Sequence, residues 1–334
     1  AMRPFLALSG QDPALLPLAE AYIRAAVWGL PFGVGFVVLR SFTSAFGRTR
    51  AILLVTVAAV LLNIPLSWAL IFGRLGAPAL GVTGAGIGVA FTNALMFLLL
   101  LVYCLRTAPF RRYAILARFH RPDWPTFREV LRVGLPIGGA ILMESGLFST
   151  ATLLMGLIGT AQLAGHQVTL QLAATAFMVP LGIGNAATIR VGLAAGALDP
   201  AGVRRAGWTA YGLGVTFTTV SGIVFWVAAE PLVALFLTAE TPEAAAARAH
   251  AAGFLRIAAI FQIVDGVQVI GISALRGLKD TTVPMWLAAL GYWAVGFPAC
   301  ALLAFGTPLE GAGIWLGLAL ALAVAALVLL RRIA

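Results

Sequence analysis

The sequence has 334 residues, of which 61% are hydrophobic and only 10% are charged. Because a soluble domain is about 45–50% apolar and about 25% charged, this composition excludes a soluble globular protein and indicates a chain that lies in a lipid bilayer. The net charge of +10 does not require a nucleic-acid partner, since the basic residues gather in connections between apolar segments and follow membrane topology.

Apolar segments follow one another along the chain, and each is long enough to cross the hydrocarbon core as a helix, which takes about 20 residues. Their continuous apolar character excludes the alternating pattern of a transmembrane β-barrel, so we expect an all-α, polytopic integral membrane protein. The nine expected spans are residues 22–46, 51–72, 83–105, 131–155, 163–189, 207–229, 250–275, 283–305 and 311–330.

Basic residues follow the first, third, fifth, seventh and ninth spans, and most of the 22 Lys and Arg residues lie on this one side. The positive-inside rule makes that side cytoplasmic, and it places the C-terminus in the cytoplasm as well. Residues 106–132, between the third and fourth spans, are rich in arginine. We expect them to form an amphipathic linker that lies on anionic lipid headgroups.

The sequence contains an internal repeat. YIRAAVWGLP at 22–31 resembles FLRIAAIFQI at 254–263, and GAGIGVAF at 84–91 resembles GAGIWLGL at 311–318. Because an even number of spans separates the matched segments, both copies enter the membrane in the same direction, as in a parallel repeat. The fourth to ninth spans make a complete six-helix unit, whereas the first three match only its second half.

We therefore expect two six-helix lobes, with a partial N-terminal lobe and its linker at residues 1–126 and a complete C-terminal lobe at 127–334. The intact protein would have twelve helices, and about three N-terminal helices would be missing from this chain. The alternative is a natural nine-helix protein, which would leave half a bundle without the partners that bury its inner faces.

Two acidic side chains, Glu144 and Asp265, lie in the middle of apolar spans, whereas the others lie at span ends or in connections. Inserting one charged side chain at the centre of a membrane helix costs a free energy of roughly 2.5–3.5 kcal/mol. Three explanations are open: a structural salt bridge, a protonated buried carboxyl, or a site for a coupling cation or proton. The nearest basic residues along the chain, Arg256 and Arg276, are too distant for easy contact with Asp265 within one helix. The pattern therefore favours the coupling site.

Polar neighbours support that interpretation. Gln262, Asp265 and Gln268 recur every three residues and indicate a polar stripe along the seventh span. Hydroxyl groups follow Glu144 within two turns, and such oxygen atoms are ligands that a hard cation such as Na⁺ accepts. His166 is either a proton shuttle or a hydrogen-bonded structural residue. Phe148, Gln171 and Phe261 are further candidates for supporting or cavity-lining roles.

Enzyme signatures are absent from the sequence. It contains no nucleotide-binding loop, no His and Cys pair at metal-ligand spacing, and no carboxylate cluster of the kind that an intramembrane prenyl transferase uses for Mg²⁺. The glycine-rich segment LGVTGAGIG at 80–88 begins a span, and we expect it to serve close helix packing. We expect a protein that is not an enzyme and that has no cofactor apart from its coupling ion.

Several motifs closely resemble the NorM-type branch of the multidrug and toxic compound extrusion (MATE) family. They are LRSFTSAFGRTRA, LLNIPLSWALIFGRLGAPALGVTGAG, GLPIGGAILMESGLFSTATLLMGLIGTAQLAGHQVTLQLAATAFMVPLGIGNAATIRVG and IFQIVDGVQVIGISALRGLKDTTVPM. The resemblance implies twelve helices in two lobes and a central cavity that opens alternately to each side. It also implies that a monomer in a bacterial inner membrane exports cationic or amphipathic drugs, driven by inward movement of Na⁺ or H⁺.

The resemblance extends to individual residues. Glu144 and Asp265 match the carboxylates that sodium-driven relatives use in the C-terminal lobe. Those relatives often carry Tyr four residues before this aspartate, whereas this sequence has Phe261 and lacks that hydroxyl. The aspartate that the family uses in its N-terminal lobe would lie in the missing part.

Two other functions stay open. A flippase for lipid-linked oligosaccharide or lipid II, from the same superfamily, usually places several cationic residues inside its cavity to hold pyrophosphate. The intramembrane charge of this sequence is mostly acidic. An intramembrane enzyme is the less favoured alternative, because it would need a polar catalytic cluster.

Overall fold

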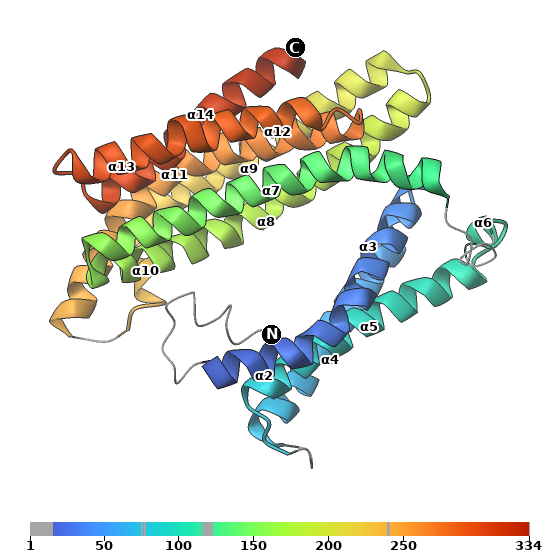
Figure 1. Cartoon of the computed structure of the whole chain (residues 1–334), viewed down its shortest axis with the longest axis horizontal. Coiled ribbons are helices and arrows are strands. Elements are labelled where there is room, and N and C mark those ends of the chain that lie inside the picture. The colour runs from blue at the N-terminus through green and yellow to red at the C-terminus, as the bar shows by residue number, and fades with distance from the viewer. Residues whose placement is uncertain are drawn as a thin grey trace. The chain divides into compact units, whose positions relative to one another are not determined.

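The computed structural model describes residues 16–74, 76, 78–113, 115, 123–238 and 241–333, and helices make up nearly all of this described part (Figure 1). Nine of its helical segments are long and apolar enough to cross a membrane. Each coincides with one of the expected spans, which confirms an all-α polytopic membrane protein. Residues 1–15 of the expected N-terminal lobe and residues 116–122 of the expected linker lie outside the described residues.

The chain divides into two compact units, Ala1–Pro122 and Asp123–Ala334, called unit 1 and unit 2 below. The sequence places the corresponding boundary between residues 126 and 127. Asp123 accounts for the difference, because its carboxylate accepts a hydrogen bond from the Thr126 N–H at 3.2 Å and so begins a helix. Such N-capping replaces a backbone partner that the first turn of a helix lacks.

Unit 1 contains three spans. The first consists of α2 (Leu16–Ala26), the short 3₁₀ helix η1 (Val27–Gly29) and α3 (Leu30–Ala45), and it is followed by α4 (Thr49–Phe72) and α5 (Val82–Arg106). The one-turn helix α6 (Ala108–Arg111) follows α5. Helix α5 packs against α2, α3 and α4 and therefore forms the centre of this unit.

Glycine residues allow α5 to approach its neighbours closely. A Cβ atom on Gly84 would lie 2.6 Å from the Leu70 carbonyl oxygen of α4, and one on Gly86 would lie 2.7 Å from the Tyr22 carbonyl oxygen of α2. Real Cβ atoms do not approach backbone so closely, so these positions need glycine. The contacts confirm the close helix packing expected for the segment 80–88.

A polar network also joins α4 to α5. The Asn63 amide donates to the Gly88 carbonyl at 3.1 Å and to the Thr92 hydroxyl, and it accepts from the Ser67 hydroxyl at 2.7 Å. Hydrogen bonds of this kind between membrane helices add to the van der Waals packing that holds them together.

Unit 2 contains six spans. They are α7 (Trp124–Ile158), α8 (Thr160–Gly196), α9 (Pro200–Val227), α11 (Pro242–Gly277), the combined span α12 (Thr282–Ala289), η2 (Leu290–Gly296) and α13 (Phe297–Phe305), and finally α14 (Gly311–Ile333); the short α10 (Ala229–Ala234) lies between α9 and α11. Helix α11 is the most buried span and packs against α8, α9 and α14. Residues on different sides of α11 therefore face different helices.

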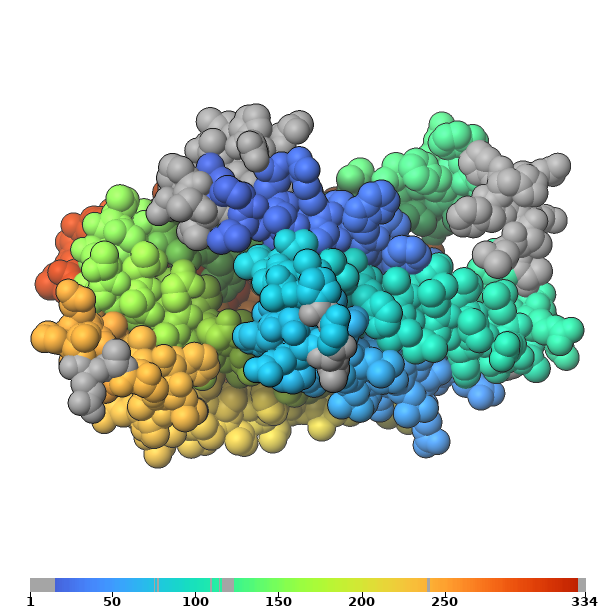
Figure 2. All heavy atoms as spheres, turned by 90° about the horizontal axis from the view of Figure 1, so that it is seen from below, coloured from blue at the N-terminus to red at the C-terminus, as the bar shows by residue number. Residues whose placement is uncertain are grey.

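Small residues bring α11 and α8 together. Figure 2 shows the first turns of α11 (orange) beside the first turns of α8 (light green) at one end of unit 2. There a Cβ atom on Gly165 would lie 2.9 Å from the Ala247 carbonyl oxygen, and the Thr169 hydroxyl donates to the Ala251 carbonyl at 3.2 Å. The alanine-rich start of α11 is thus a packing surface.

The helix η2 is a π-helical turn in the middle of a span. The Phe297 N–H donates to the Tyr292 carbonyl five residues earlier, which gives the wider π-turn. Pro298 follows directly, and because proline has no N–H it cannot donate the α-helical hydrogen bond to the carbonyl four residues earlier. The buried side chain of Tyr292 comes from this turn.

Candidate cation-coupling site

Asp265 lies on the side of α11 that faces the interior of unit 2, and only 6% of its surface is exposed. Phe261 and Gln268, one turn before and one turn after it, share this side of the helix. The Phe261 ring lies 6.1 Å from the Phe148 ring of α7 and 5.6 Å from the Trp315 ring of α14. The carboxyl group therefore lies on the α11 surface that packs towards α7 and α14.

Glu144 comes from α7 and lines a cavity of about 280 Å³ within unit 2. Ser145, Phe148, Gln268 and Arg276 line the same cavity. Asp265 is not part of the lining, but it is close enough to interact electrostatically with Glu144. The structure thus brings together the two carboxyl groups that the sequence singles out.

Two carboxylates that interact electrostatically repel each other when both are charged, and burial in a low-dielectric interior strengthens the repulsion. A proton or a cation relieves it. The ion pairs found among the described residues join Arg24 to Glu20, Arg256 to Glu230 and Lys279 to Glu129. Neither Glu144 nor Asp265 belongs to these pairs, so a permanent salt bridge does not occupy the site.

Arg276 is a site residue that the sequence indicated only as a basic residue too distant from Asp265 for easy contact within one helix. It lies three turns beyond Asp265, close to the same side of α11, lines the cavity, and interacts electrostatically with Glu144. The signal was present in the sequence, because a spacing of eleven residues returns a side chain to nearly the same face of a helix. Its actual partner, Glu144, is on another helix and could not be identified from spacing.

Tyr292 is a second site residue that the sequence analysis missed. Its hydroxyl accepts a hydrogen bond from the Gln268 amide, and it interacts electrostatically with both Glu144 and Asp265. The π-turn η2 positions this buried phenol. It supplies an oxygen atom near the carboxyl groups, whereas Phe261 supplies none.

His166 is fully buried beside the ring cluster, 5.6 Å from the Trp315 ring. Its Nε2 atom lies 3.1 Å from the Thr152 hydroxyl, which itself donates to the Phe148 carbonyl at 3.0 Å. A hydroxyl has one hydrogen, so the Thr152 hydroxyl accepts from a protonated Nε2. The Nδ1 atom has no hydrogen-bond partner among the described residues.

Two of the expected site residues lie away from the carboxyl pair. The Gln262 amide donates to the Ala173 carbonyl of α8 at 3.2 Å, and Gln171 is exposed on α8. The expected polar stripe therefore divides between two packing surfaces. Because each step of three residues turns the direction by about 60°, Gln262 and Gln268 point about 120° apart.

The described part of the chain contains no group of three or more His, Cys, Asp or Glu side chains placed to hold a metal ion. A monovalent cation or a proton needs fewer charged ligands than a structural metal. The carboxyl pair with the Ser145 hydroxyl, the Gln268 amide and the Tyr292 phenol offers the hard oxygen atoms that such ions prefer.

Comparisons with known proteins identify related sequences. The MatE family model matches residues 1–69 and 136–302. A probable multidrug resistance protein NorM from Mesorhizobium japonicum is 46% identical over 324 residues, which are 97% of this chain and 69% of that protein. A protein of the same description from Rhizobium meliloti is 43% identical over 326 residues, or 98% of this chain and 70% of its own length.

Solved structures share the fold. The crystal structure of the eukaryotic MATE transporter AtDTX14 aligns with a TM-score of 0.84 at 23% identity, covering 99% of this chain and 72% of that one. A crystal structure of MATE in complex with MaL6 aligns with a TM-score of 0.87 at 20% identity, covering 100% and 74%.

Proposed function

Because this chain belongs to the MatE family of membrane transporters, we propose that it exports cationic or amphipathic drugs in exchange for an inward-moving cation. The family makes it a transporter and not an enzyme. One observation carries the antiport proposal: Glu144 and Asp265, from two different membrane spans, interact electrostatically beside a cavity. Neither belongs to the ion pairs found among the described residues.

The coupling follows from the charge of this pair. When Na⁺ or H⁺ binds between α7 and α11, repulsion between the carboxylates falls and the two helices can pack more closely; when the ion leaves, the repulsion returns. An ion that has different affinities in the two arrangements shifts the equilibrium between them by that difference. A drug that binds only the ion-free arrangement would then be exported as the ion moves inward.

The available energy is adequate for this exchange. One charge that moves through about 100 mV releases about 2.3 kcal/mol, and about 1.4 kcal/mol corresponds to a tenfold concentration ratio. One ion could sustain roughly a fifty-fold gradient of a neutral drug. For a cationic drug exchanged one for one, the electrical contributions cancel and the concentration gradient of the ion drives export.

Both Na⁺ and H⁺ fit the site. Phe261 lacks the hydroxyl found in many sodium-driven relatives, and its ring packs against Phe148 and Trp315. The Tyr292 hydroxyl lies near both carboxyl groups and can replace the missing oxygen.

The cavity chemistry argues against the flippase alternative. A cavity that holds a pyrophosphate needs several cationic groups, and Arg276 is the cationic member of the lining described here, where it interacts with Glu144. A carboxylate in that position would also repel a phosphorylated lipid.

We further propose a bacterial inner-membrane location with a cytoplasmic C-terminus, and transport by a monomer without a nucleic-acid partner. The apolar spans support the membrane location, and the basic residues in alternate connections support the orientation.

Transport by the purified chain in proteoliposomes would test the function. A fluorescent cationic dye is loaded, and a Na⁺ gradient or a pH gradient is imposed separately. We expect one gradient to accelerate dye movement, and an E144Q variant to lose that acceleration. The matched control is E230Q, because Glu230 is an exposed residue paired with Arg256 outside the site. Dye movement that responds to neither gradient would contradict the antiport proposal.

A further inference from the structure

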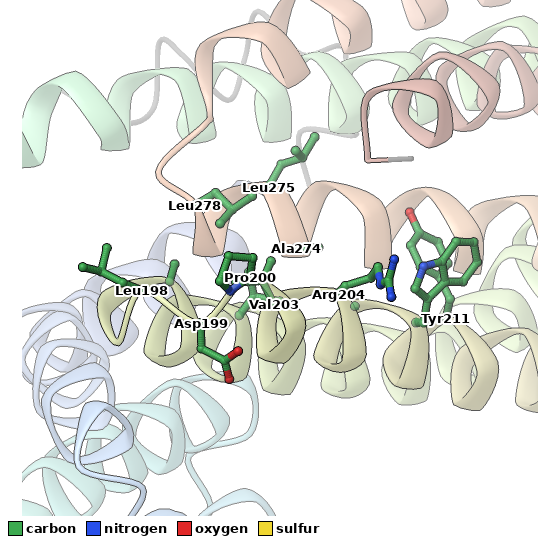
Figure 3. Close-up of a pocket in the computed structure, with 13 residues that line it drawn as sticks. Leu198, Asp199, Pro200, Val203, Arg204, Tyr211, Ala274, Leu275 and Leu278 are labelled. Carbon is green, nitrogen blue, oxygen red and sulfur yellow. The ribbon is translucent and has the colours of Figure 1, made fainter.

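A second cavity in unit 2, separate from the cation-coupling site, lies between the end of α8, the start of α9 and the end of α11 (Figure 3). Its volume is about 560 Å³, within the range of about 300–1,000 Å³ that is typical of ligand sites. Most of its wall is apolar, including Val191, Val203, Ala274 and Leu275. We call it the α8–α9–α11 cleft.

Arg204 supplies a positive charge at this cleft. It lies in the second turn of α9, is exposed, and takes part in none of the ion pairs found among the described residues. The nearby Asp199 caps α9 by accepting from the Gly202 N–H at 2.9 Å. In Figure 3 the Asp199 carboxylate points away from the Arg204 side chain. The guanidinium group is therefore available to an external anion.

Tyr211 supplies a polar group deeper in the cleft. It lies two turns after Arg204, close to the same face of α9, and the Arg204 side chain extends towards it in Figure 3. Only 6% of Tyr211 is exposed, and its hydroxyl has no hydrogen-bond partner in the described part of the chain. Because buried hydroxyls normally have partners, this hydroxyl at the wall of the cleft lacks an acceptor.

The surroundings of the cleft are those of a membrane interface. Leu198 is 89% exposed and Trp208 is 60% exposed, and both line it. Tryptophan is enriched where hydrocarbon meets the headgroups. Arg190 and Arg205 line a neighbouring cavity on the other side of α9 and do not line the cleft. Basic pockets between membrane helices attract anionic lipid headgroups.

We propose that the α8–α9–α11 cleft binds one anionic glycerophospholipid. Its phosphate pairs with Arg204, an ester carbonyl accepts a hydrogen bond from Tyr211, and an acyl chain covers the apolar wall. A glycerophospholipid carries these three parts in this order, from charged phosphate through ester to hydrocarbon. The site differs from the cation site in residues and in ligand, and it does not depend on which ion drives transport.

Native mass spectrometry of the purified chain in detergent would test the site, with phosphatidylglycerol and phosphatidylcholine of identical acyl chains as probes. We expect phosphatidylglycerol to be retained at about tenfold lower concentration, because the choline cation of phosphatidylcholine offsets the attraction between its phosphate and Arg204, and a tenfold ratio needs only a small electrostatic difference. R204Q should remove the preference. R205Q is the matched control, since Arg205 is adjacent but lines the other cavity, and it should keep the preference.

A second variant tests the cleft without removing a charge. Gly207 lines the cleft, and a Cβ atom there would meet nothing within 4 Å. G207L should therefore fold, and its side chain should fill the cleft, so that the protein retains neither lipid. Gly212 on the same helix is equally unobstructed but is not part of the lining, so G212L should bind as the parent does. Y211F should weaken the binding of both lipids alike, so that the ratio of phosphatidylglycerol to phosphatidylcholine retention stays unchanged.

Three outcomes would overturn the proposal. Unchanged phosphatidylglycerol retention in G207L would show that lipid binds elsewhere. An unchanged preference in R204Q would remove the headgroup contact. Displacement by glycerol 3-phosphate as effective as displacement by the intact lipid would show a simple anion site.

Discussion

The aromatic ring at position 261 determines which oxygen atoms surround Asp265. Phe261 is 2% exposed and packs edge-on against Phe148 and Trp315, so its side of the carboxyl group is apolar. The phenol of Tyr292 and the amide of Gln268 approach instead from the η2 side. The site therefore has an apolar wall formed by Phe261 and a polar wall formed by Tyr292 and Gln268.

At this scale, Asp265→Asn should abolish ion-driven export while the protein stays folded. The amide has nearly the same shape as the carboxyl group but cannot release a proton or neutralise a cation. Since an unpaired buried charge is costly, thermal stability should be unchanged or slightly higher. Dye efflux from vesicles measures the first effect, and scanning fluorimetry the second. Parental efflux in D265N would show that Asp265 is not the coupling group.

Arg276→Gln should raise the apparent affinity for the coupling cation by roughly tenfold, because the guanidinium group competes electrostatically with that cation for Glu144. The ion should then leave slowly, so that the maximal dye efflux rate falls. R276K keeps the charge and serves as the matched control. The measurement is efflux rate against cation concentration in proteoliposomes. Identical curves for R276Q and the parent would remove Arg276 from the coupling mechanism.

At the scale of elements, α11 connects the site to the rest of unit 2. One side of it carries Asp265 and Gln268 towards α7 and η2, whereas Gln262 bonds to α8. A further side packs against α9, where Gly266 faces Thr218. Because one buried helix contacts all these neighbours, an ion-dependent change at Asp265 can be passed to several helices at once.

Glycine contacts fix the distances between these helices. A Cβ atom on Gly317 of α14 would lie 2.6 Å from the Cys300 backbone nitrogen of α13. We expect Gly317→Ala to lower the stability of the protein by about 1–3 kcal/mol, because the helices must separate. Scanning fluorimetry in detergent would detect this as a lower melting temperature.

The control for that substitution is Gly212→Ala, where a Cβ atom would meet nothing within 4 Å. It should leave stability unchanged or raise it slightly, since alanine is the better helix former. Equal melting temperatures for the two variants would contradict the close approach of α13 and α14.

At the scale of the whole molecule, each unit has the same order of packing in its last three spans. The third of these spans, α5 in unit 1 and α14 in unit 2, packs against both others. The GAG segments that the sequence analysis matched begin these two helices. This packing order supports the internal repeat.

The orientation of the chain can be tested by cysteine labelling. The native Cys104 and Cys300 are free and buried, so they should react little with a membrane-impermeant maleimide. Ala201, in the first turn of α9, and Thr238, beyond the end of α9, are both exposed. They therefore lie towards opposite ends of this membrane span. A201C should be labelled only after the membrane is opened, and T238C should be labelled in intact spheroplasts. The reverse pattern would contradict a cytoplasmic C-terminus.

The sequence by itself determined the protein class, the nine spans and the two mid-membrane carboxyl groups. These properties depend on local composition and on segment length, because hydrocarbon requires long apolar helices and makes each buried charge conspicuous. The family resemblance likewise rested on a local property, because its motifs are contiguous in the sequence.

The tertiary structure alone decided which side chains share the site. It added Arg276 and Tyr292 to Glu144, and it directed Gln262 towards α8. These contacts depend on where the π-helical turn η2 begins and on the direction in which each side chain leaves α11. Sequence spacing gives the direction of a side chain on its own helix, whereas the helix that it meets depends on packing between segments far apart in the chain.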